Sequence, residues 1–225
     1  MDHRIPDRSD LKHCVILCHP DPDSFCAAVA DRYCDVVRRH GDHVIVRDLY
    51  QMGFDPVLRA AERPTSPDFR LSADVEDELG LIAGTAQFVF IYPLWFGTPP
   101  AMLKGYVERV LGAGFSHRAV RDQQFHPILS GRNLLSFSSS GSSWAWLNEK
   151  AAWVALRHVF DDYLASAFSL ARCDHVHFDC IVDGMKPRFV REQLLRAEQE
   201  AEKICAQLHH RPGVPEARPQ QPMGI

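Results

Sequence analysis

The sequence predicts an α/β domain in which a five-stranded parallel β-sheet lies between two layers of helices. Along most of the 225 residues, short apolar or β-branched runs alternate with segments of helical periodicity. Such alternation is typical of a parallel sheet with helices on both faces, a three-layer sandwich. The run Gln87–Tyr92 (QFVFIY) is continuously apolar, as a parallel strand buried on both faces should be.

The first half of the chain is expected to supply three strands and two helices. Ser24 can cap the first helix, whose apolar residues recur at helical spacing, and Gly41 ends it. The segment 51–72 contains three prolines and is interpreted as an irregular surface excursion, not as a domain. We therefore expect strands over 13–18, 43–48 and 87–92, and helices over 25–39 and 74–83.

The second half of the chain completes the sheet with two more strands. Pro100 stands near the first turn of the helix after strand three, where proline is tolerated. We expect helices over 100–111, 146–165 and 188–209, and strands over 132–138 and 174–182. Five strands without a GxGxxG turn after the first favour the strand order 2-1-3-4-5 over a full dinucleotide-binding fold.

The last residues of the chain differ in composition from the rest. The tail 211–225 contains four prolines and little that could pack against a core. We expect this tail to be disordered, so that residues 1–210 form a single ligand-binding domain.

Composition and charge exclude several classes of function. A net charge of −4 and a pI near 6.3 argue against a nucleic-acid-binding protein. No apolar run approaches the ~20 residues that a membrane span needs, and the N-terminus lacks the apolar core of a secretory signal. The seven cysteines show no CxxC spacing, which argues against a metal site and fits reduced thiols. We therefore expect a cytoplasmic protein that binds neither nucleic acid nor metal and has no membrane span.

In open α/β sheets, ligands bind outside the carboxyl ends of the strands, so the loops there are the candidate sites. The loop after strand one, His19–Phe25, leads directly into a helix N-terminus, where free N–H groups and the helix dipole attract anions. His19 and Ser24 could add side-chain donors to a phosphate site. In the alternative interpretation, Ser24 is only a helix cap and His19 an ordinary loop residue. This loop alone favours neither interpretation.

The loop after strand three, Pro93–Pro99, carries the aromatic residues Trp95 and Phe96 at the strand end. Their rings could contact a planar conjugated ligand, or they could simply fill core space. A turn between two prolines is a poor place to bury two large rings, so the ligand interpretation is favoured.

The loop after strand four, Ser138–Ser143, consists of small polar residues. Such residues let the backbone approach a ligand closely, and their hydroxyls can reach its polar edge. The alternative is a flexible linker. Its position at a strand end favours a ligand-binding role.

One stretch of the chain resembles a known family. Residues Ile91–His117, IYPLWFGTPPAMLKGYVERVLGAGFSH, are similar to the pattern of the NAD(P)H:quinone oxidoreductase (DT-diaphorase-like) family, which has a flavodoxin-like fold. The loop from His19 to Phe25 and the segment Asp48–Pro56 match more weakly but in the correct order. The resemblance spans roughly residues 13–185.

The resemblance implies a flavin, FMN or FAD, in the crevice at the strand ends. The excursion over 56–73 is shorter than in FAD-bearing relatives, which favours FMN. Trp144, Trp146 and His117 are candidates for the substrate pocket. The residues implied to contact the flavin are His19, Ser24, Phe25 and the adjacent Cys26 at the phosphate, Pro93, Leu94, Trp95 and Phe96 along the isoalloxazine, and Ser138, Ser139, Ser140 and Gly141 at the pyrimidine edge.

The resemblance also implies an activity and an assembly. NADH or NADPH would give a hydride to the flavin, and a quinone or related acceptor would then take two electrons in the same pocket. Family members are homodimers with the active site at the subunit boundary, to which the helix near Pro100 would contribute. Two alternatives stay open: a flavin-binding ancillary subunit of a potassium efflux system, and a flavodoxin-type electron carrier.

The sequence departs from the family at several functional positions. Cys26 stands where some members have Asn, and Ser140 replaces a glycine of the loop after strand four. Trp146 and Ala152 stand at the spacing of a Tyr and a His that assist charge relay in some members. The sequence therefore assigns no proton relay and no catalytic side chain.

Several other residues are interpreted without a ligand. Lys104 and Arg109 could meet a nucleotide phosphate but are more often solvated or paired. Trp153 is expected in the core, and His175 and His177 are expected to face outward from strand five.

Overall fold

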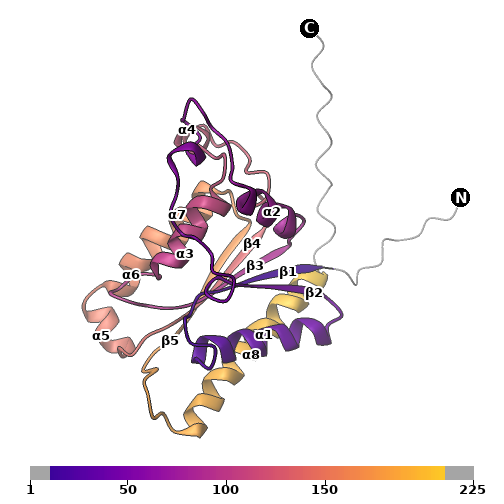
Figure 1. The fold of residues 1–225 in the computed structure, drawn as a ribbon. Coiled ribbons are helices and arrows are strands. Elements are labelled where there is room, and N and C mark those ends of the chain that lie inside the picture. Colours follow the sequence, from indigo (N-terminus) through magenta and orange to yellow (C-terminus); the bar gives the residue numbers. More distant parts are fainter. Residues whose placement is uncertain (1–10, 211–225) are drawn as a thin grey trace, which may run out of the picture.

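Five parallel strands form one sheet in the order β2-β1-β3-β4-β5, as predicted (Figure 1). The structure, a computed structural model, describes residues 11–210. Within this range, no helix combines the length and the apolar character needed to cross a membrane. The strands are β1 (Lys12–Leu17), β2 (His43–Asp48), β3 (Gln87–Pro93), β4 (Asn133–Ser139) and β5 (Arg172–Phe178).

The two central strands, β3 and β4, are buried along their whole length. They pair in register, with Tyr92 opposite Ser138 and Pro93 opposite Ser139. Burial on both faces explains the continuous apolar run that predicted β3. Strand five is shorter than predicted: it ends at Phe178, and residues 179–182 belong to the following loop.

One face of the sheet is covered by α1 (Phe25–Arg39) and α8 (Pro187–His210), which lie side by side in Figure 1. The predicted bounds of α1 are confirmed. Ser24 caps this helix by accepting a hydrogen bond of 3.2 Å from the Ala27 N–H, and Gly41 follows it with a φ of +80°. The tail 211–225, predicted to be disordered, lies outside the described residues.

The other face carries α2 (Ala73–Ile82), α3 (Ala101–Tyr106) and the segments between 144 and 167. The π-helical segment η2 (Val107–Leu111) continues α3. The single helix predicted over 146–165 is wrong in detail, because Ala151 adopts a left-handed φ of +53° that interrupts it. The segments are α5 (Trp144–Glu149), α6 (Ala152–Leu156), the π-helical η3 (Arg157–Asp162) and α7 (Tyr163–Ala167).

The excursion over 51–72 is not merely a surface loop, because it supplies one half of a buried ion pair. The 3-10 turn η1 (Ala60–Glu62) places Glu62 against Arg109 of η2, with N···O distances of 3.0 and 2.7 Å. This pairing lowers the pKa of Glu62 to about 2. Removing either partner of such a buried pair typically costs about 3–5 kcal/mol. Arg109 therefore anchors the excursion and is not free to bind a nucleotide phosphate.

The excursion also packs on α3 through Gly105. A Cβ at Gly105 would lie 2.3 Å from both the Cβ and the carbonyl oxygen of Pro56. Because two of the nearest atoms belong to the backbone of Pro56, which cannot easily move away, this helix position has no room for a side chain. The glycine of the LKGY segment is thus explained by packing.

We expect Gly105→Ala to destabilise the protein by about 1–3 kcal/mol, because the methyl group would overpack this contact. The matched control is Gly80→Ala in α2, where no atom lies within 4 Å of the Cβ position. That change should stabilise the helix by up to about 1 kcal/mol. Urea unfolding of both variants measures the difference, and equal effects at the two positions would contradict the packing argument.

Burial also makes the fold sensitive to acid. Desolvation lowers the pKa of His13 and of His126 from 6.5 to about 4. The unfolded chain therefore binds more protons than the native protein between these values, so stability is full above pH 6.5 and is lost as the pH falls toward 4. The loss is on the order of 3 kcal/mol per histidine.

Replacing His126 with Asn tests this dependence. The Nδ1 atom of His126 accepts hydrogen bonds of 3.2 and 3.1 Å from the N–H groups of Ile128 and Leu129, and an Asn side-chain oxygen can replace that acceptor. We expect a shallower fall of the unfolding free energy between about pH 6.5 and about pH 4. An unchanged slope in urea titrations would show that His126 does not contribute.

Candidate functional site

Two adjoining cavities lie over the carboxyl ends of β1, β3 and β4, where the three candidate loops meet. The first has a volume of about 460 Å³ and the second about 370 Å³. Leu94 and Ser140 line both. The three loops thus form one crevice, as the strand order predicted.

The first cavity lies at the N-terminus of α1. His19, Ser24, Phe25 and Cys26 line it, and the first N–H groups of the helix have no intrahelical acceptor. The Ser24 hydroxyl already caps the helix, and the His19 Nδ1 atom accepts from the Asp21 N–H at 3.1 Å. The cap interpretation of Ser24 is therefore confirmed. Ser24 also lines the cavity, so its hydroxyl could contact a ligand in addition to capping the helix.

The charges around the first cavity are acidic. Asp21, Asp23 and Asp183 line it, whereas no Lys or Arg of the described part of the chain does. An anion here would be held by backbone N–H groups, hydroxyls and the helix dipole and not by a salt bridge. Burial raises the pKa of the Cys26 thiol to about 11, and its Sγ lies 3.5 Å from the Ser139 hydroxyl.

The loop after β3 is a tight turn that presents its aromatic rings to solvent. The N–H of Trp95 donates to the carbonyl of Thr98 at 3.0 Å, and the reverse bond is 3.2 Å long. Between them Phe96 and Gly97 both have positive φ, +51° and +82°, the pattern of a type I′ turn. Trp95 is 39% exposed and Phe96 fully exposed. Neither ring fills the core, as expected.

The serine loop after β4 is fixed in place by the chain that follows β5. The Ser140 N–H donates to the Phe178 carbonyl at 3.0 Å, and the Ile181 N–H donates to the Ser140 carbonyl at 2.8 Å. The Cys180 N–H also donates to the Ser142 carbonyl at 3.1 Å. These bonds argue against a flexible linker. They also place Ile181–Met185 in the wall of the first cavity. This part of the wall was not predicted, because the sequence pattern assigned residues up to 182 to strand five.

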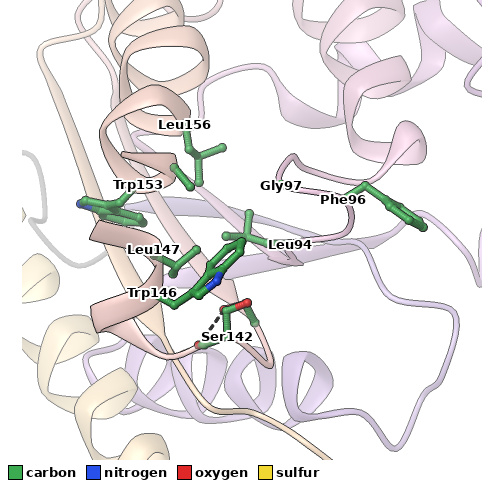
Figure 2. Close-up of a pocket in the computed structure, with 10 residues that line it drawn as sticks. Leu94, Phe96, Gly97, Ser142, Trp146, Leu147, Trp153 and Leu156 are labelled. Carbon is green, nitrogen blue, oxygen red and sulfur yellow. Dashed lines mark hydrogen bonds between the residues drawn. The ribbon is translucent and has the colours of Figure 1, made fainter. Parts of the chain in front are cut away.

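The second cavity is largely apolar. Figure 2 shows Trp146 extending from α5 toward Leu94, with Leu147 and Leu156 beside it and Phe96 pointing away. Ala152 also lines this cavity, so the two positions that depart from the family's Tyr and His both lie in its wall. Neither side chain is a Brønsted acid or base near neutral pH.

Most of the predicted site residues meet in the crevice. Ser138 is an exception, because it is only 1% exposed and lines neither cavity. His117 is a second exception: it begins α4 (His117–Arg121), in the segment that leads to the amino end of β4, and it lines neither cavity. In Figure 1, α4 lies well apart from α5, whose Trp146 lines the second cavity. The residues that line one or both cavities are His19, Ser24, Phe25, Cys26, Pro93, Leu94, Trp95, Phe96, Ser139, Ser140, Gly141 and Trp146.

Two expectations about residues near β5 are wrong, and the expectation for Trp153 is correct only in part. His175 and His177 do not face outward: the side chain of His175 is fully buried, and His177 is only 6% exposed. His175 faces η3, where Asp161 is its partner, and His177 lies on the same strand face, where it contacts Ser138 and Ser140. Trp153, expected in the core, packs against the core cluster but is only half-buried, because it also lines the second cavity and contacts both imidazole rings. Trp144 lies beside Trp153 on the outer side and not in the two crevice cavities.

A matching family model and a curated relative agree with this geometry. A model described as a flavodoxin-like fold matches residues 11–205. An uncharacterized NAD(P)H oxidoreductase of Haemophilus influenzae is 29% identical over 174 residues, which cover 77% of this chain and 84% of the relative. The resemblance to oxidoreductases of this kind is therefore confirmed.

Solved structures show the same fold. An NAD(P)H:quinone oxidoreductase from Methanothermobacter marburgensis aligns with a TM-score of 0.73 at 23% identity, over 87% of this chain and 96% of the other. An FMN-dependent NADH-azoreductase from Bacillus anthracis, solved with FMN, aligns with a TM-score of 0.62 at 16% identity, over 89% and 100%. Since the family model spans nearly all of the described residues, this chain belongs to the flavodoxin-like fold family.

Proposed function

We propose that this protein is a flavoenzyme that transfers two electrons from NAD(P)H to a quinone or a related electrophilic acceptor. The observation that carries the proposal is the pair of adjoining cavities, one at a helix N-terminus and one apolar, joined at Leu94 and Ser140. This arrangement fits a ligand with an anionic group at one end and a flat apolar ring system at the other.

The donor set of the crevice fits a flavin mononucleotide. The N–H groups at the start of α1, with His19 and Ser24, would hold the phosphate. Leu94 and Trp95 would contact the ring system, and the hydroxyl of Ser140 would reach its polar edge. FMN is favoured over FAD because a neighbour of the same fold was solved with FMN and because the excursion over 51–72 is occupied in packing on η2 and α3. A bound flavin would supply the hydride chemistry.

The chain's own contribution on the substrate side is apolar. Trp146, Leu147 and Leu156 line the second cavity and would exclude water from a planar substrate. Trp146 stands where some family members have Tyr, and it keeps an aromatic face without the phenolic hydroxyl, which favours stacking of nicotinamide or quinone rings. The identity of the acceptor would be decided in this cavity, whereas the preference between NADH and NADPH would depend on residues that contact the adenosine ribose, where the two nucleotides differ.

A homodimer is part of the proposal. Val154, Val159 and Tyr163 are exposed along α6, η3 and α7, next to an apolar cavity of about 410 Å³ beside Pro99. Lys104 also lines this cavity and pairs with Glu108. Exposed apolar side chains beside a ligand crevice are typical of a subunit interface. The second subunit would then complete the open side of the second cavity.

The purified protein should bind FMN with a flavin absorbance spectrum, lose that absorbance when NADH or NADPH is added anaerobically, and regain it with a quinone. A protein that binds neither FMN nor FAD would refute the flavoenzyme. Bound flavin that neither nucleotide reduces would instead indicate a regulatory subunit or an electron carrier.

Trp95→Ala tests the ring-binding loop. We expect its FMN dissociation constant to rise roughly fivefold, because the lost aromatic contact is worth about 1 kcal/mol. Phe125→Ala is the control, since Phe125 is an exposed aromatic residue outside the crevice. Fluorescence titration with FMN measures both, and equal affinities would show that the wrong loop has been assigned.

Val159→Arg tests the dimer. A charge at this 77% exposed position should disrupt an apolar interface and yield a monomer in light scattering. Leu195→Arg on α8, on the opposite face of the sheet, should leave the assembly unchanged. A wild-type monomer, or a Val159→Arg dimer, would contradict the proposed interface.

A further inference from the structure

A continuous chain of hydrogen bonds runs from a buried carboxylate to the wall of the crevice. The carboxylate of Asp161, on η3, lies 2.6 Å from the Nδ1 atom of His175. The Nε2 atom of His175 lies 2.6 Å from the Ser138 hydroxyl, which lies 2.8 Å from the Nδ1 atom of His177. The Nε2 atom of His177 lies 3.1 Å from the hydroxyl of Ser140, which lines both cavities.

The sheet register holds this chain in place. His177 lies opposite Ser138 in the β4–β5 pair, and His175 lies two residues earlier on the same face. The side chain of Asp161 is fully buried, and the ring of Trp153 lies 4.7 and 5.4 Å from the two imidazole centroids. Polar groups in such surroundings are costly unless each is hydrogen-bonded. The chain gives both imidazole rings and both hydroxyls a partner, whereas Oδ1 of the Asp161 carboxylate has none.

Two arrangements of protons give each hydrogen bond of the chain one donor and one acceptor, and they differ by one proton. In the first, neutral His175 donates from Nδ1 to Asp161, Ser138 donates to His175, His177 donates from Nδ1 to Ser138, and Ser140 donates to His177. In the second, His175 is an imidazolium and donates from both nitrogens, so every other donor reverses and Ser140 donates to the Ser142 carbonyl at 3.2 Å. Passing between them moves one proton between His175 and Ser140.

The order Asp161–His175–Ser138 also resembles a hydrolase triad, but the burial of Ser138 argues against that use. Its hydroxyl is enclosed between two imidazoles and reaches no cavity. A nucleophile must be accessible to a substrate carbonyl. Ser138 is placed to pass a proton and not to attack.

We propose that Asp161, His175, Ser138, His177 and Ser140 form a proton relay that delivers one proton to the crevice in each turnover. The inference rests on the proposed function, in which NAD(P)H, a proton and a quinone give NAD(P)⁺ and a hydroquinone. The hydride brings one hydrogen with two electrons, and the second hydrogen arrives as a proton. Trp146 and Ala152 in the cavity wall cannot supply it.

The relay discharges in steps that conserve every proton. His175 gives its Nε2 proton to Ser138, which gives its hydroxyl proton to Nδ1 of His177. His177 gives its Nε2 proton to Ser140, and Ser140 gives its own hydroxyl proton to the group in the crevice. The positive charge on His175 disappears, and the Asp161 carboxylate keeps its negative charge.

The charged groups around His175 and His177 differ, so the two rings have different roles in the relay. Asp161 contacts His175 directly, with Arg157 of η3 3.2 Å from the same carboxylate. Burial, and then the nearby His175, lowers the pKa of His177 to about 4, whereas Asp179 acts in the opposite direction and Arg196 of α8 in the same direction. Tyr92 of β3 packs against His175, and Glu200 of α8 lines a cavity of about 420 Å³ that both histidines share beside β5. His177 thus stays neutral, and the cavity beside β5 is the solvent space next to the relay.

Nitrogen NMR of the histidine rings tests the relay without any activity. In the full chain without flavin, titrated from about pH 5 to about pH 9, His177 should carry its proton on Nδ1 when His175 is neutral and on Nε2 when His175 is protonated. Ser138→Ala should abolish this coupled tautomer change. Ser136→Ala, a buried serine on the same strand face outside the chain, should preserve it. A His177 tautomer that ignores the protonation of His175 in the wild type would overturn the relay.

Kinetics of the FMN-loaded protein with NADH and a benzoquinone give the second test. Ser138→Ala and His177→Phe should lower kcat on the order of 10- to 100-fold, with an altered pH profile and an unchanged FMN dissociation constant. Ser138→Thr, which keeps a hydroxyl at this position, should retain the wild-type rate. The Ser136→Ala control should also match the wild-type rate. If His177→Phe does not fold, His177→Gln replaces it.

The outcomes separate the relay from the proposed function. Variants that bind FMN and match the wild-type rate and pH profile would overturn the relay and leave the flavoenzyme intact. A wild-type protein that binds no flavin would refute the proposed function, and the relay as a supplier of that reaction would fall with it even if the tautomers were coupled. Coupled tautomers together with the predicted rate losses would support both.

Discussion

The parallel pairing of β3 with β4 is the constraint on which the rest of the structure depends. Both strands are buried on both faces, so their backbone groups can be satisfied only by each other and by the neighbouring strands. The Leu94 N–H extends the pairing past the strand end by donating to the Ser139 carbonyl at 2.7 Å. That bond fixes where the aromatic turn leaves β3 and where the serine loop leaves β4. The two adjoining cavities follow from these departure points.

Short-range sequence patterns, such as helix caps and apolar runs, correctly predicted α1 and the five strands of the sheet. The bounds of α1 followed from Ser24 as a cap and from a glycine in the left-handed region after the helix, and the strands needed only apolar or β-branched runs. The break at Ala151 could not be predicted, because alanine favours helix and adopts a left-handed φ here through its tertiary context. The end of β5 was missed for a related reason. An edge strand with alternating polar residues does not reveal where pairing with its single neighbour stops.

The candidate site also contains some features that the sequence could predict and others that it could not. Residues in loops directly after strands could be predicted to meet, because parallel strands end at one edge. The pairings of Arg109 with Glu62 and of His175 with Asp161 could not, since nothing in the sequence indicates which of many charged residues is the partner. A histidine on an edge strand is usually exposed, and the Asp161 carboxylate and the Ser138 hydroxyl, which pair with its two nitrogens, make burial of His175 tolerable. The short His-x-His spacing did indicate one shared face, but not which side that face would contact.

The apolar wall of the second cavity and the polar chain behind it solve two parts of one problem. A cavity lined by Trp146, Leu147 and Leu156 would exclude water once its open side is covered, which would keep a bound ring dry but would also remove the usual proton source. A proton must then come through the protein, and a carrier in a dry interior has to be hydrogen-bonded at every step. The burial that lowers the pKa of His177 therefore suits it to pass a proton, while the Asp161 carboxylate fixes the orientation of the His175 ring by a hydrogen bond. Placing polar residues in the wall itself would serve the proton but would readmit the water that the wall excludes.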